Sequence, residues 1–149
     1  MRHLSIMATL VCAASPVLAG DNCWDIVEAK YGVPKALLYA IAKTESNMNP
    51  RAEGKNTNGS RDIGLMQINT SWLPVLKRHG IAEKDLKDPC VSLHVGAWVL
   101  ANNFATYGKG WRAVGAYNAR TEYKRVAYAK KVEANLAKLT KESVYAKAK

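Results

Sequence analysis

The residue best suited to do chemistry is Glu45, at the end of a stretch with the apolar spacing of a helix. Its apolar neighbours are Leu38, Ile41 and Ala42, which with the glutamate fall at positions i, i+3, i+4 and i+7 of one helix face. Such a face normally packs on the core, where an ionised carboxylate is costly, so burial is expected to raise the pKa of Glu45. A carboxyl that is neutral near pH 7 can act as a general acid. The alternative is an ordinary glutamate in the last helical turn, facing solvent or paired with a lysine.

Helical patterns must position this glutamate, and they extend over most of the chain. Its helix is expected to begin at Pro34, where a missing N–H is harmless, and to end within 47–50, where Asn and Pro resist continuation. The polar stretch 51–61 contains the tight-turn pair Asn58-Gly59 and predicts a small β-hairpin. Apolar stripes predict further helices within 24–31, 72–76, 89–107, 111–117 and 128–139.

These patterns predict one mostly α domain over 20–140, of the α+β kind, with at most a small β-hairpin. That length is enough to bury a core, and no internal repeat or linker interrupts it. The last residues, 141–149, are basic and are expected to form a flexible tail.

The first residues, 1–19, have the pattern of a secretory signal peptide. A basic start at Arg2 precedes an apolar run over 4–18, and Ala19 closes a small-residue cleavage site. The run is too short for a membrane anchor, so no stable membrane insertion is expected. We therefore expect cleavage after Ala19 and export to the periplasm.

Two cysteines remain after the expected cleavage, Cys23 and Cys90. In an oxidising compartment their pairing across 67 positions is the expected outcome, and two free buried thiols are the alternative.

The chain is strongly basic, with 22 Lys and Arg against 12 Asp and Glu and a formal charge of +10. The excess is concentrated from Arg120 onward, which suits a polyanionic surface or is simply a solvated helix face. No zinc pattern, recognition helix or aromatic RNA-binding motif is present, so no nucleic-acid partner is expected. His79 and His94 lack metal-ligand spacing, and neither a metal nor a cofactor is expected.

Three short motifs give the glutamate a context: TES at 44–46, GLMQI at 64–68 and GAYNA at 115–119. In this order and spacing they resemble the soluble lytic transglycosylase (SLT) family, whose lysozyme-like domains cleave peptidoglycan. The resemblance covers the chain from the Cys23 region to about Val132. Because it also has the signal-peptide pattern and the two cysteines, the chain resembles in particular the small transglycosylases that accompany secretion, conjugation and pilus machines.

The resemblance implies a role for each motif residue. Glu45 matches the catalytic acid, and the hydroxyl of Tyr117 is expected to orient its carboxyl. Tyr128 matches a later family tyrosine more weakly. The implied substrate-binding residues are Ser46, Gly64, Met66, Gln67, Tyr117, Asn118 and Tyr128. Taken without the family, Met66 and both tyrosines would more often be core residues.

The chain departs from the family pattern at Arg120, where Gly is usual, and at Asp62, where most members lack an acid. The segment 56–64 resembles animal c-type lysozymes, whose second catalytic carboxylate occupies the position of Asp62. Asp62 is therefore a second candidate catalytic residue, which could stabilise positive charge or act as a nucleophile. A turn-capping aspartate is the alternative.

The implied function is cleavage of the β-1,4 bond between N-acetylmuramic acid and N-acetylglucosamine with a 1,6-anhydro product. The expected partners of this monomer are peptidoglycan glycan strands and components of a secretion, conjugation or pilus apparatus. The alternatives are a hydrolytic muramidase that uses Asp62, a non-catalytic wall-binding assembly module and, least favoured, a basic nucleic-acid binder.

Overall fold

The computed structural model describes residues 21–147, and the side chains of 22–143. The expected signal peptide, 1–19, lies outside the described residues. The elements in chain order are α1 (Asp21–Tyr31), α2 (Lys35–Ser46), β1 (Glu53–Lys55), β2 (Arg61–Ile63), β3 (Ile68–Asn69), η1 (Thr70–Trp72), α3 (Leu73–Arg78), η2 (Glu83–Lys87), α4 (Pro89–Tyr107), α5 (Trp111–Asn118) and α6 (Glu122–Lys147). The predicted α+β class, mostly helical with a small sheet, is confirmed.

Helix α2 lies at the centre of the helical part and packs on α1, α4 and α6. Leu38 and Ile41 are completely buried, as the apolar spacing predicted. The helix ends because Asn47 adopts a left-handed conformation with a φ of 52°, and its N–H closes on the carbonyls of Ala42 and Lys43. This end leaves Glu45 in the last turn of α2.

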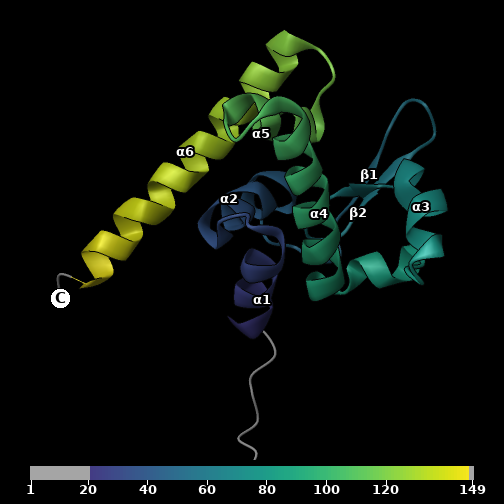
Figure 1. Ribbon diagram of the computed structural model, residues 1–149, viewed down its shortest axis with the longest axis horizontal. Coiled ribbons are helices and arrows are strands. Elements are labelled where there is room, and N and C mark those ends of the chain that lie inside the picture. The colour runs from purple at the N-terminus through teal and green to yellow at the C-terminus, as the bar shows by residue number, and fades with distance from the viewer. Residues whose placement is uncertain (1–20, 148–149) are drawn as a thin grey trace, which may run out of the picture.

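Helix α4 separates the sheet from α1 and α2, as Figure 1 shows. The Asp88 carboxylate begins this helix by accepting hydrogen bonds from the N–H groups of Cys90 and Val91, both at 2.9 Å. Directly after that cap, the predicted disulfide from Cys90 to Cys23 joins α4 to α1, with a Cα–Cα distance of 5.9 Å. The pairing expected from the two cysteines is confirmed.

The sheet is antiparallel with the order β1-β2-β3. The predicted hairpin is present, and a third strand of two residues extends it. In the register, Asp62 of the central strand lies opposite Gly54 on β1 and Asn69 on β3. The middle of the sheet therefore surrounds one carboxylate with a glycine and an amide.

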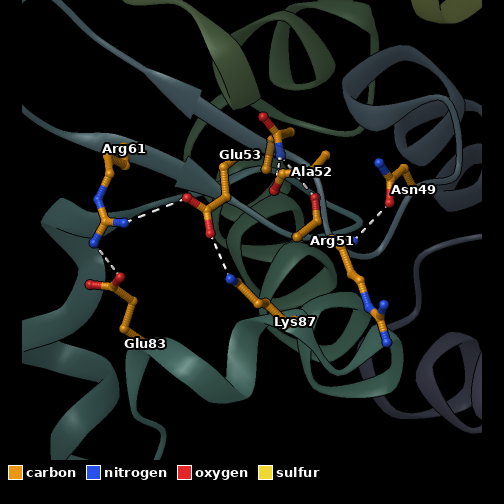
Figure 2. A network of polar contacts seen from close by, with 9 residues as sticks. Asn49, Arg51, Ala52, Glu53, Arg61, Glu83 and Lys87 are labelled. Atoms are coloured by element: carbon orange, nitrogen blue, oxygen red, sulfur yellow. Dashed lines mark hydrogen bonds and ion pairs between the residues drawn. The ribbon is translucent and has the colours of Figure 1, made fainter.

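Ion pairs tie the sheet to η2. Figure 2 shows Arg61 of β2 between Glu53 and Glu83, while Lys87 approaches Glu53 with its Nζ at 2.6 Å from Oε1. Each group is about two-fifths exposed, so any one pair stabilises little and the network acts together. It holds the back of the sheet against the segment that leads into α4.

Helices α5 and α6 cross in close contact at Gly115. A Cβ at Gly115 would lie 2.5 Å from the backbone oxygen of Arg125, so a larger residue cannot fit without moving α6. The same helix α6 packs along α2. It continues to Lys147, past the expected domain end at residue 140 and into the segment expected to be a tail. Among the described residues, no helix is long and apolar enough to cross a membrane.

Replacing Cys23 and Cys90 together by alanine is expected to lower the free energy of unfolding by about 4 kcal/mol, because the bond closes a loop of 67 positions in the unfolded chain. Urea unfolding of both proteins, with and without reductant, measures this. Reductant should weaken the wild type alone. Equal stability of the two oxidised proteins would contradict the expectation.

Candidate active site

The carboxyl of Glu45 is held by one hydrogen bond in a largely buried position. The hydroxyl of Tyr128 on α6 donates to its Oε1 at 2.5 Å. Burial raises the pKa of Glu45 from 4.5 to about 7, the Tyr128 hydrogen bond opposes this rise, and the negative charge of Asp62 adds to it. The carboxyl is therefore half protonated near neutral pH, which suits an acid that must also act as a base.

Two tyrosines near Glu45 stack on each other. The rings of Tyr117 and Tyr128 are 6.5 Å apart and 15° from parallel. The hydroxyl of Tyr117 donates to the carbonyl of Met66 at 2.8 Å, not to the Glu45 carboxyl. The sequence predicted Tyr117 as the residue that orients the carboxyl, and in the structure Tyr128 makes that contact instead. Burial raises the pKa of Tyr128 above its usual range, so its hydroxyl remains a donor.

Asp62 is fixed by two side-chain amides. Asn56 donates to its Oδ2 at 2.9 Å, and Asn69 donates to its Oδ1 at 2.8 Å. These partners are side chains from the β1–β2 turn and from β3, whereas a turn-capping aspartate would bind backbone N–H groups nearby. The geometry therefore disfavours the turn-capping alternative.

A cleft of about 760 Å³ lies between the sheet and α5, and both acids line it. One wall comes from the β1–β2 turn, the sheet and η1, and the other from the end of α5 and the residues that follow it. The predicted site residues that line it are Glu45, Asp62, Gln67, Tyr117 and Asn118. A polar cleft with two carboxyls in its lining can hold a saccharide.

The GLMQI segment supports the cleft from behind. Gly64 has a φ of 81°, and a Cβ there would lie 2.0 Å from the carbonyl oxygen of Leu86, so the close approach is made to η2. Met66 is completely buried. Of the five residues in this segment, Gln67 and Ile68 line the cleft. The Nε2 of Gln67 donates to the carbonyls of Ala52 and Gly64.

Ser46 also has a structural contact. Its Oγ donates to the carbonyl of Leu65 at 2.7 Å and so joins the end of α2 to the GLMQI segment. The structure thus brings Glu45, Asp62, Gln67, Tyr117 and Asn118 together in the cleft. Ser46, Gly64, Met66 and Tyr128 are not among the described residues that line the cleft.

Among the cleft residues that the sequence reasoning did not name as site residues are Asn56, Asn69 and Trp72. The two asparagines hold Asp62, and Trp72 packs edge-on against Trp98 with ring centroids 5.3 Å apart. The hairpin register around Asn58-Gly59 could have pointed to Asn56. Asn69 belongs to a two-residue strand that has no pattern of its own.

One group of possible metal ligands occurs among the described residues. The ligand atoms of Cys23, Cys90 and His94 lie within 4.8 Å of one another. Both sulfurs are bonded to each other, so they are not thiolates that could hold a metal. This group is a disulfide beside a histidine and gives no support for a metal centre.

Comparisons with known proteins agree with this geometry. The transglycosylase SLT domain family matches residues 22–139. Invasion protein IagB of Salmonella typhimurium is 48% identical over 126 residues, covering 81% of this chain and 79% of that protein. Protein IpgF of Shigella flexneri is 41% identical over 133 residues, covering 86% of this chain and 88% of that protein.

The fold is also similar to a solved structure, an inactive mutant of the lytic transglycosylase Slt from Pseudomonas aeruginosa. The TM-score is 0.62 at 18% identity, over 79% of this chain and 23% of that much longer chain. At this identity the likeness concerns the fold alone, whereas the family match and the relatives cover most of the sequence. The chain belongs to the transglycosylase SLT domain family.

Proposed function

We propose that this protein is a peptidoglycan lytic transglycosylase in which Glu45 acts first as the acid and then as the base. The scissile bond is the β-1,4 linkage between N-acetylmuramic acid and N-acetylglucosamine, and the product carries a 1,6-anhydro end. The observation that carries the proposal is the Glu45 carboxyl, with a pKa of about 7 and a position in the lining of a polar cleft.

In the first step, neutral Glu45 donates its proton to the glycosidic oxygen as the bond from that oxygen to the anomeric carbon breaks. Positive charge develops at the anomeric carbon. In the second step, the C6 hydroxyl of the same sugar attacks that carbon, and the Glu45 carboxylate takes up the hydroxyl proton. The acid is regenerated and no water is consumed.

The surroundings of Glu45 suit both steps. Burial favours the neutral carboxyl before reaction, since charge is costly in that position. The Tyr128 hydroxyl stabilises the carboxylate that forms when the proton leaves. The two effects oppose each other, and their balance near neutral pH allows one group to give and regain a proton.

Asp62 is proposed to support the positive charge at the anomeric carbon. Its two amide hydrogen bonds hold the carboxylate in the sheet, and it lines the same cleft as Glu45. This second acid also favours a second candidate function, hydrolysis by a muramidase in which Asp62 acts as nucleophile. A wall-binding module without turnover would not require a neutral buried acid at all.

We further propose that the protein acts in the periplasm, where it opens the wall locally for a secretion, conjugation or pilus apparatus. Support comes from the resemblance to small transglycosylases of such machines and from the relative named an invasion protein. The signal-peptide pattern at 1–19 agrees with this location.

Digestion of purified wall by the wild type is expected to release muropeptides with 1,6-anhydro ends, identified by mass spectrometry. Glu45→Gln should release none, because the amide has no proton to donate. Asp62→Asn should slow release without changing the product. Reducing ends in place of anhydro ends would establish hydrolysis, and turnover by Glu45→Gln would exclude the proposed acid.

Glu45→Gln is also expected to change stability with pH. Because folding raises the pKa of Glu45 from 4.5 to about 7, the folded state binds the proton more tightly, and wild-type stability falls as pH rises between these values. The variant should therefore be more stable by up to about 3 kcal/mol at pH 8 and show no such gain at pH 4. Urea unfolding across this range measures the difference. A gain that does not change with pH would contradict burial of the acid.

Tyr128→Phe removes the hydrogen bond that lowers the pKa of Glu45, so the alkaline limb of kcat/KM should move to higher pH while the maximal rate falls. Tyr117→Phe is the matched control, because it loses a hydroxyl bonded to the carbonyl of Met66. Measured pH profiles should show the shift in the first variant alone. Equal shifts in both would mean that the contact with Glu45 is not the cause.

A further inference from the structure

Among the described residues that line the cleft, Arg120 is the only basic one. It follows Asn118 and Ala119 at the point where the chain leaves α5 and turns toward α6. Its side chain is exposed, and no hydrogen bond or ion pair to another described residue involves it. A guanidinium with five donors is thus available on the wall opposite the sheet.

The loop that carries Arg120 is held in place by Arg125 of α6. The Nε of Arg125 donates to the carbonyl of Ala119 at 3.0 Å. That guanidinium lies 4.6 Å from the ring centroid of Tyr107, and the Arg125 side chain is only 12% exposed. Arg125 therefore fixes the backbone next to Arg120, so the Cα of Arg120 has a defined position at the cleft.

No carboxylate of the described residues forms an ion pair with Arg120. Asp62, a carboxylate of the same cleft, has both oxygens bonded to Asn56 and Asn69. The nearest acid along the chain, Glu122, forms ion pairs with Arg112 and Arg125 instead. The positive charge is consequently free to meet a negative charge on a ligand.

The chemistry of a glycan strand narrows the choice of ligand. Sugar hydroxyl and acetamido groups are neutral, and neutral polar side chains such as those in the cleft lining can bind them without a charge. An exposed cation suits an anion, and the anions on a peptidoglycan strand are the carboxylates of the peptide stem or, where the stem has been removed, the carboxylate of the muramyl lactyl group. Arginine binds a carboxylate through two parallel hydrogen bonds.

We propose that Arg120 forms a carboxylate-binding subsite at the cleft, which recognises the acidic appendage of N-acetylmuramic acid. This inference rests on the proposed function, since it takes peptidoglycan as the ligand. In this proposal, Arg120 makes the protein bind an anionic strand more tightly than a neutral glycan of the same length.

The test measures binding in the Glu45→Gln background, where cleavage does not interfere. Three probes of equal length are titrated: a glycan with peptide stems, a glycan whose stems have been removed so that the lactyl carboxylate is free, and a neutral N-acetylglucosamine oligomer. Arg120→Gln should weaken binding of an anionic probe about three- to fivefold, as expected for an exposed ion pair, and leave the neutral oligomer unchanged. High salt should remove the difference, and Arg120→Lys should restore part of it.

The pattern of loss identifies the source of the carboxylate. Loss with the stem-bearing probe alone assigns the stem, and loss with the stem-free probe alone assigns the lactyl group. Arg78→Gln, at an exposed arginine outside the cleft, is the matched control and should change nothing. Equal loss for the neutral oligomer, or no loss for either anionic probe, would overturn the subsite. Absence of anhydro products from wild-type digests would instead overturn the proposed function, whatever the binding result.

Discussion

The hydrogen bond from Tyr128 to Glu45 joins the helix that carries the acid to the last helix of the chain. Its partners are 83 positions apart and meet only because α6 packs along α2. Helix α6 also crosses α5 closely at Gly115, where a Cβ would meet the backbone of α6. Gly115 of the GAYNA motif does not touch Glu45. Its lack of a side chain lets α6 lie close to α5, and α6 carries the tyrosine that reaches the acid.

The cleft holds two carboxyls whose surroundings differ in kind. Glu45 sits at the end of an apolar helix face, and burial raises its pKa to about 7. Asp62 sits in a sheet, where amides satisfy both of its oxygens. Placing one acid on the helical side and the other on the β side gives each its own solvation, and the negative charge of Asp62 further favours the neutral form of Glu45.

Features set by local chemistry could be predicted from the sequence. The helix around Glu45, its end at Asn47 and the start of α4 at Asp88-Pro89 follow from spacing and capping, and the mostly α class follows from such patterns. Features set by distant packing could not. The strand at Ile68–Asn69 is too short to have a periodicity, so the amide of Asn69 was not expected beside Asp62. Which tyrosine reaches Glu45 depends on how two helices cross, and no local pattern encodes that angle.

The disulfide between Cys23 and Cys90 separates the site into two parts along the chain. Both acids lie inside the covalent ring that it closes, whereas α5 and α6, with Tyr117 and Tyr128, lie beyond it. A chain that has closed the ring before α6 docks would expose Glu45 to water, and the carboxyl would titrate as any solvated glutamate does. The pKa that suits Glu45 to acid catalysis therefore depends on a helix outside the covalent ring.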